Sequence, residues 1–190
     1  MGKDFWVLVG RKPMFYLHEK VVYPGHGIAE VNRVVEKNIG GESKKLLELR
    51  FLHKEMVVLV PLSNVDEIGL RKLSSKSDID NIYKVFAIPT DWKRNENIST
   101  SWSKKSKKYQ TDLSSGDIYK ISKIYRELKN ISVKKELSFG ERALLQQAET
   151  LLAQEISMVQ DIFEDKAKNQ LRSFFGSPIV KISKHSEKTI

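Results

Sequence analysis

The segment ISTSWSKKSKKYQT, residues 98–111, places a tryptophan beside a dense group of cations and contains no acidic residue. Trp102 is closely followed by Lys104, Lys105, Lys107 and Lys108. Ammonium groups can neutralise phosphates, and an apolar ring can be inserted beside a partly unstacked base step. On a helix, Lys104 and Lys108 would be one turn apart, and we expect them to share a face with Trp102. This combination predicts contact with a nucleic acid.

The competing interpretation makes Trp102 a core residue and the lysines a solvated face. Large aromatic side chains are usually mostly buried, which favours that interpretation. The polar residues on both sides of Trp102 leave it little core to join, which favours an exposed ring. Trp92 is the other candidate for a DNA contact, but its setting, PTDWKRNE, contains acidic residues.

Residue patterns for catalysis or metal binding are missing from the sequence. There is no cysteine, and the four histidines lack metal-ligand spacing such as HExxH. His26, in PGHG, is better explained as a turn residue than as a general base, and the glycines around it match no phosphate-binding loop. We therefore expect no enzyme, no metal and no cofactor.

The net charge favours a polyanionic partner. Lys and Arg number 33 against 24 Asp and Glu, which gives a formal charge of +9 over 190 residues. Such a balance is typical of proteins that bind nucleic acid or an acidic protein surface. No apolar run is long enough to cross a membrane, and the absence of cysteine fits a reducing compartment, so we expect a cytoplasmic protein.

Residues 17–72 have the pattern of an antiparallel β domain. Strand-like runs are separated by Pro24-Gly25, by Gly40-Gly41 and by Lys54-Glu55, with no helical period between them. Closely spaced strands of this kind predict a meander or a small barrel. Pro61 lies near the end of the last run, which fits an edge or strand-end position.

Residues 73–164 predict a helical domain, so the fold class expected is α+β. Ser77 and Asp80 have the spacing of an N-terminal cap, and Ser138 and Glu141 have that of a capping box. Three helical faces are predicted to be buried: Ile79, Ile82, Tyr83 and Phe86; Ile118, Ile121, Tyr125 and Leu128; and Leu144, Leu145, Ala148, Leu151, Leu152, Ile156 and Val159. We expect residues 1–16 to be a loosely attached extension and residues 165–190 to be a mobile tail.

Several segments together resemble the CarD/CdnL family of bacterial transcription regulators. They are, in order, VVYPGHGIAEV, VPLSNVDEIGLR, SWSKK followed by LSSGD, and LSFGERALLQQAETLLAQEIS. The resemblance runs from about residue 17 to 164. The first motif is also similar to the polymerase-interacting domain of transcription-repair coupling factors, and the helical motifs distinguish the two groups.

The resemblance implies a Tudor-like β domain that docks on the β subunit of RNA polymerase, and a helical domain that touches promoter DNA without reading its sequence. Trp102 matches the tryptophan that wedges into the minor groove at the upstream edge of the bubble and stabilises the open complex. Arg142 matches a position that contacts the DNA backbone, and Lys37 matches a basic position used for the β subunit. Leu59 stands where some relatives have arginine, which puts that salt bridge in doubt and leaves strand-edge pairing or apolar contact.

Two other functions stay open on the sequence alone. One is a stand-alone nucleic-acid-binding protein, such as a ribosome-associated factor, and the other is an adaptor whose basic face meets an acidic protein. Binding to DNA or RNA without polymerase would favour the first. We expect a monomer in each case.

Overall fold

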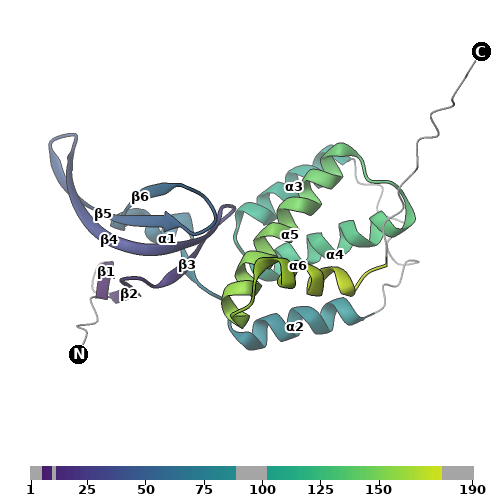
Figure 1. Ribbon diagram of the computed structural model, residues 1–190. Helices are drawn as coiled ribbons and strands as arrows, with labels where there is room; N and C mark the ends of the chain where they lie inside the picture. The colour runs from purple at the N-terminus through teal and green to yellow at the C-terminus, as the bar shows by residue number, and fades with distance from the viewer. Residues whose placement is uncertain (1–5, 10–11, 89–101, 177–190) are drawn as a thin grey trace, which may run out of the picture.

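The computed structural model describes residues 6–9, 12–88 and 102–176. Strands occupy the first part of this chain and helices the second, and the two units lie side by side (Figure 1). The predicted α+β class, with an antiparallel β unit followed by a helical unit, is confirmed. None of the helices in the described ranges is long and apolar enough to span a bilayer.

The β unit contains a five-stranded antiparallel sheet in the order β6-β5-β4-β3-β7. Its strands are β3 (Lys20–Tyr23), β4 (Gly27–Ile39), β5 (Glu42–Phe51), β6 (Val57–Pro61) and β7 (Arg71–Lys72). A 3-10 turn, Leu62–Asn64, and a short helix, α1 (Val65–Ile68), connect β6 to β7. The predicted strand breaks are all present, and Pro61 ends an edge strand as expected.

The β4–β5 hairpin projects beyond the rest of the sheet (Figure 1). Of β4, the part that pairs with β3 is Gly27–Glu30, and of β5, the part that pairs with β6 is Leu46–Arg50. Gly40 and Gly41 both have positive φ, at 65° and 85°, and they close the hairpin at its far end. The core of the sheet lies at the other end of the hairpin, where Val31, Leu47 and Leu49 are fully buried.

The prediction of a loosely attached extension over residues 1–16 is wrong at its C-terminal end. β1 (Trp6–Val9) and β2 (Lys12–Tyr16) form a two-stranded hairpin. Phe15 is only 2% exposed and belongs to the core of the β unit. The Tyr16 backbone N–H also donates to the Glu19 carboxylate at 2.7 Å. The five residues of β2 therefore include a core aromatic that alternation alone does not reveal.

The helical unit is made of α2 (Lys76–Ala87), α3 (Trp102–Ser114), α4 (Ile118–Lys134), α5 (Phe139–Gln160) and α6 (Glu164–Ser173). Its core contains the three predicted apolar faces, either fully buried or packed against buried residues. Ser138 and Glu141 form the predicted capping box at the start of α5.

The cap of α2 differs from the prediction by two residues. Ser75 and Asp78 form the capping box, not Ser77 and Asp80. Both pairs have the same spacing, so local sequence could not choose between them. A tertiary contact favours the earlier pair, because the second oxygen of Asp78 accepts a hydrogen bond from the Tyr119 hydroxyl of α4 at 2.7 Å.

The expectation of a patternless tail from residue 165 is wrong for its first part, because α6 covers Glu164–Ser173. Ala167 and Leu171 are fully buried in the helical core. Phe174 then stacks on Tyr83 of α2, with ring centroids 5.3 Å apart. Few apolar residues of α6 face the core, so the sequence of this segment shows only a weak helical periodicity and does not predict the helix. Residues 177–190 lie outside the described ranges.

Candidate functional site

Trp102 is the first residue of α3, and its side chain is on the surface. The residue is 41% exposed, so the core interpretation of this tryptophan is not supported. The ring rests against the start of α5, since a Cβ built on Gly140 would lie 3.5 Å from Trp102 Cζ2. One part of the indole is thus seated on the protein, and the rest is available to a partner. Trp92, the competing candidate, lies outside the described residues.

The first turn of α5 is held by reciprocal hydrogen bonds. The Ser138 backbone N–H donates to Glu141 Oε2 at 2.8 Å, and the Glu141 N–H donates to Ser138 Oγ at 3.3 Å. Burial disfavours the charged form of Glu141, but hydrogen bonds from Ser138 and Lys135 outweigh it and lower the pKa of this carboxyl. The turn that touches Trp102 is therefore firmly capped.

This turn carries two exposed side chains, Phe139 and Arg142. Arg142 was predicted as a DNA contact, and its side chain is 60% exposed, with Nη1 3.7 Å from the Glu136 carboxylate. Arg142 is two residues beyond Gly140, the glycine under the indole, so its side chain leaves the helix in a nearly opposite direction to that contact. Phe139 was not predicted, and it is 84% exposed. Its position in the sequence could have predicted this exposure, because Phe139 lies off the apolar face of the helix, which contains Leu144 and Ala148.

The lysines of α3 do not form a single group around Trp102. Lys104, Lys107 and Lys108 are exposed. The expectation that Lys104 and Lys108 share a face with Trp102 is wrong, because residues two apart on a helix point in nearly opposite directions. The positions below Trp102 on its own face are Lys105 and Tyr109.

Lys105 is paired within the protein. Its ammonium forms an ion pair with Glu127 of α4 and lies 5.6 Å from the centre of the Tyr109 ring. Tyr109 is buried, and burial raises the pKa of its hydroxyl far above the ordinary value. Lys105 would have to leave these contacts to reach a phosphate, whereas the contact of Arg142 with Glu136 is longer, at 3.7 Å.

The two residues predicted for polymerase binding lie on one face of the sheet. Lys37 is opposite Lys44 in the β4–β5 ladder, and Leu59 of β6 is opposite Glu48 of β5. Lys44 and Glu48 are an even number of residues apart along β5, so their cross-strand partners, Lys37 and Leu59, point to the same face of the sheet. Leu47 points to the opposite face, toward the core. The separation of four residues corresponds to about 13 Å along the strand.

The surroundings of these two residues differ. Lys37 is exposed on the projecting part of the hairpin, whereas Leu59 is half-buried on an edge strand. Glu48 below Leu59 accepts hydrogen bonds from Asn32 at 2.5 Å and from Arg33 at 3.1 Å. The hydrogen bond from Asn32 is the main cause that lowers the pKa of Glu48. Leu59, where some relatives have arginine, therefore places an apolar side chain on the edge strand, opposite the Glu48 carboxylate, which already has partners within the protein.

Within residues 6–9, 12–88 and 102–176, no group of His, Asp and Glu side chains has the arrangement of a metal site. His26 occupies the turn between β3 and β4, and its ring packs edge-on against Tyr23, with centroids 5.3 Å apart. This packing supports its interpretation as a turn residue.

Comparison with protein families gives matches to both units. Residues 15–74 match the model described as the CarD-like/TRCF RID domain, and residues 84–172 match the model of the CarD C-terminal domain. The chain belongs to the CarD/CdnL family. It is thereby a CarD-like transcription factor, and its N-terminal unit belongs to a domain family that interacts with the β subunit of RNA polymerase.

Two individual proteins that are similar to this chain are the following. The chain is 23% identical over 163 residues to the Bacillus subtilis (strain 168) protein named "Putative transcription factor YdeB". That match covers 82% of this chain and 99% of the relative. Among solved structures, the solution structure of the 72-residue N-terminal domain of Myxococcus xanthus CarD is 30% identical, with a TM-score of 0.28. It covers 31% of this chain and 79% of that domain.

Proposed function

We propose that this protein binds the RNA polymerase β subunit through its β unit and promoter DNA through the surface formed by Trp102 and the first turn of α5. It stabilises the open promoter complex without reading sequence and without catalysing a reaction. The observation that carries the proposal is the placement of Trp102, which is exposed yet seated against the first turn of α5.

This placement suits a wedge in the minor groove. Inserting an apolar ring beside a base step requires partial unstacking, which costs a few kcal/mol. The step is already unstacked at the edge of a bubble, so a ring held in place binds melted DNA better than closed duplex. A factor with such a preference shifts the equilibrium only by its differential affinity. About 1.4 kcal/mol of preference would raise the ratio of open to closed complex tenfold.

A wedge also needs cations nearby that bind the phosphates of the DNA backbone and keep the DNA in place. Arg142 supplies an exposed cation on the helical turn that supports the indole, and exposed Phe139 adds apolar surface on the same turn. Lys104, Lys107 and Lys108 widen the positive surface along α3 and contribute through longer-range attraction. Lys105 contributes less, because Glu127 neutralises it.

On the polymerase side, the free edge of β6 supports docking by strand addition. β6 is the first strand in the sheet order, and Val57 is 56% exposed along it. A partner strand would pair with its unused backbone groups, with Leu59 giving apolar contact. Lys37 adds a charge contact from the projecting hairpin.

Measuring the lifetime of the open complex with polymerase and a promoter tests the proposal. Trp102→Ala should no longer lengthen the lifetime of the open complex, while it retains its fold and its binding to an isolated lobe of the polymerase β subunit (the β lobe). Trp102→Phe should keep part of the effect, because a smaller ring still fills some of the gap. An unchanged lifetime with Trp102→Ala would show that the ring is not the wedge.

Phe163→Ala is a matched control. Phe163 is an aromatic residue 86% exposed at the start of α6, beyond the opposite end of α5. The 22 residues of α5 put it roughly 30 Å from Trp102. It should leave the lifetime unchanged. Tight DNA binding by the protein alone, with no effect of polymerase, would instead favour a stand-alone nucleic-acid-binding protein. Full activity without DNA crosslinks at Trp102 would favour an adaptor.

A further inference from the structure

Arg71 at the end of the β unit uses every N–H of its guanidinium at the junction between the two units. Nε and Nη2 donate to the Gly116 carbonyl of the α3–α4 turn at 2.9 and 2.6 Å. Nη1 and Nη2 donate to the two carboxylate oxygens of Glu155 at 2.7 and 2.9 Å. Nη1 also donates to the Lys72 carbonyl at 3.0 Å. Because the planar guanidinium donates with all its N–H groups, these contacts fix both the distance and the relative orientation of the groups that they join.

Glu155 is equally committed to this contact. Its side chain is only 3% exposed on α5, and Oε1 also accepts from the Ser74 backbone N–H at 2.9 Å and from Ser74 Oγ at 2.7 Å. A small change of angle would break these bonds while Glu155 is still buried, which would leave the carboxylate without its cation and is strongly unfavourable. The pair therefore opposes any change of angle between the sheet and α5.

The β3–β4 turn makes a second contact with the helical unit, where backbones approach closely. A Cβ at Gly116 would lie 3.1 Å from Pro24, and one at Gly25 would lie 3.3 Å from the Ser114 backbone. A Cβ at Gly27 would lie 2.2 Å from Gln154 Oε1, in a backbone with φ of +105°. A third contact joins His53, after β5, to Glu164 of α6 at 3.2 Å.

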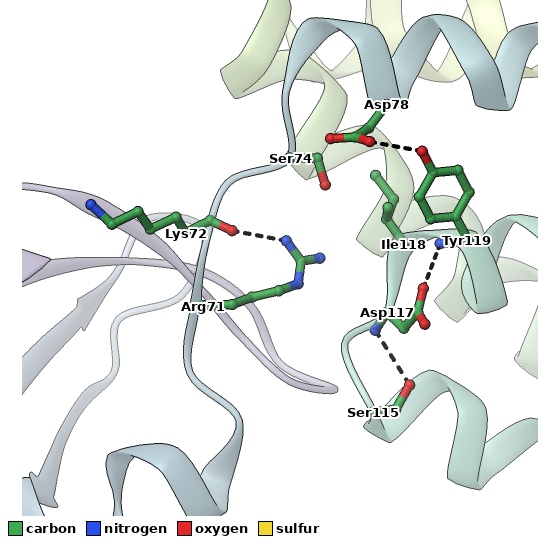
Figure 2. A pocket seen from close by; sticks show the side chains of 8 residues that line it. All are labelled: Arg71, Lys72, Ser74, Asp78, Ser115, Asp117, Ile118 and Tyr119. Atoms are coloured by element: carbon green, nitrogen blue, oxygen red, sulfur yellow. Dashed lines mark hydrogen bonds between the residues drawn. The ribbon is translucent and has the colours of Figure 1, made fainter. Parts of the chain in front are cut away.

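The cleft beside the junction gives no sign of a ligand site. Figure 2 shows Arg71 and Lys72 on one side and Asp78, Asp117 and Tyr119 on the other. The charged groups drawn there already have partners in the protein, including Lys72 with Glu19 at 2.9 Å and Asp117 with the Tyr119 N–H at 2.9 Å. The junction is built to hold the units together.

We propose that Arg71 and Glu155 form an interdomain latch that holds the β unit and the helical unit at one fixed angle, and that they act as positioning residues for Trp102. The functional part of this inference rests on the proposed function. A polymerase-bound β unit presents the indole at one place only if the junction is rigid. A loose junction would spread the ring over many positions and lose part of the gain from joining two binding sites.

The latch is tested by measuring the distance between the units in the free protein. The chain contains no cysteine, so Glu55→Cys and Gln147→Cys introduce one spin label on an exposed position of each unit. Arg71→Lys keeps the charge but loses the fork, and Glu155→Gln keeps the size and the acceptor for Ser74. Arg172→Lys is the matched control, because Arg172 makes the same kind of forked bond to Glu149, at 2.9 and 2.5 Å, inside the helical unit.

The distribution of label distances should be narrow in the parent and in Arg172→Lys, and broad in Arg71→Lys and Glu155→Gln. Equal narrow distributions in all four proteins would overturn the latch. In a second measurement, the two latch variants should shorten the open-complex lifetime toward its value without the protein, while retention on the β lobe is unchanged.

The two measurements separate the latch from the proposed function. Broad distance distributions with an undiminished lifetime would overturn the positioning role. A parent protein that fails to lengthen the lifetime would overturn the proposed function, and the distance measurement would still decide whether the latch exists.

Discussion

Leu171 gives the sharpest test that α6 belongs to the folded helical unit. Its side chain is 0% exposed and packs in the helical core, in a segment whose sequence pattern predicts a tail. Replacing a fully buried leucine by alanine removes apolar contacts and leaves a cavity, which destabilises proteins by about 2–5 kcal/mol. Because α6 covers the core from one side and can partly collapse, we expect about 3 kcal/mol for Leu171→Ala. For a chain of this length, that corresponds to a melting temperature lowered by roughly 6–12 °C.

The assay is urea unfolding of the full chain followed by circular dichroism, with Asn169→Ala as the control. Asn169 is exposed on the same helix, so its replacement removes no buried contact and improves helix propensity slightly. The midpoint should fall for Leu171→Ala at an unchanged denaturant dependence, and stay nearly constant for Asn169→Ala. Two variants of equal stability would refute the reasoning, since a mobile segment loses nothing when its leucine is shortened.

Three further outcomes follow from the charges. Lys37→Glu should reduce retention on an immobilised polymerase β lobe, whereas Lys166→Glu, an exposed charge reversal on α6, should not. Arg142→Ala should reduce the slope of log K against log salt for DNA binding by about 0.9, the loss of one phosphate contact. Burial opposes ionisation of Glu149, but the bond from Arg172 outweighs it and lowers the pKa below the ordinary 4.5. That contribution is complete above the ordinary value and is lost as pH falls through the lowered pKa, so an acid titration of unfolding free energy should be shallower in Arg172→Ala than in the parent.

The order of elements and most of the buried positions could be predicted from periodicity and turn residues. The helical faces from Ile79 to Val159 are in the core because a stripe at helical spacing has few alternatives in a small domain. The strand break at Gly40-Gly41 follows from backbone conformations that other residues adopt rarely. The exposure of Trp102 followed from the lack of apolar neighbours in its segment.

Tertiary contacts decided the features that local pattern could not. The spacing of Ser75 with Asp78 is repeated two residues later, and the bond from Tyr119 on another helix favours the first pair. Lys105 looks equivalent to its neighbours in sequence, but Glu127 of α4 lies within its reach. Arg71 is an unremarkable cation at a strand end until the fold brings Glu155, 84 residues later, against it.

Helix α5 connects the features on which the proposed mechanism depends. Its first turn carries Phe139 and Arg142 and supports the indole, and sixteen residues later Glu155 joins it to the β unit. Sixteen residues of a helix are a rigid rod of about 24 Å, so an angular error at the latch becomes a displacement at the indole. A tilt of about 10° would move the ring by roughly 4 Å over that length, comparable to the spacing between stacked bases. A wedge that must meet one base step therefore needs a junction as fully bonded as that of Arg71.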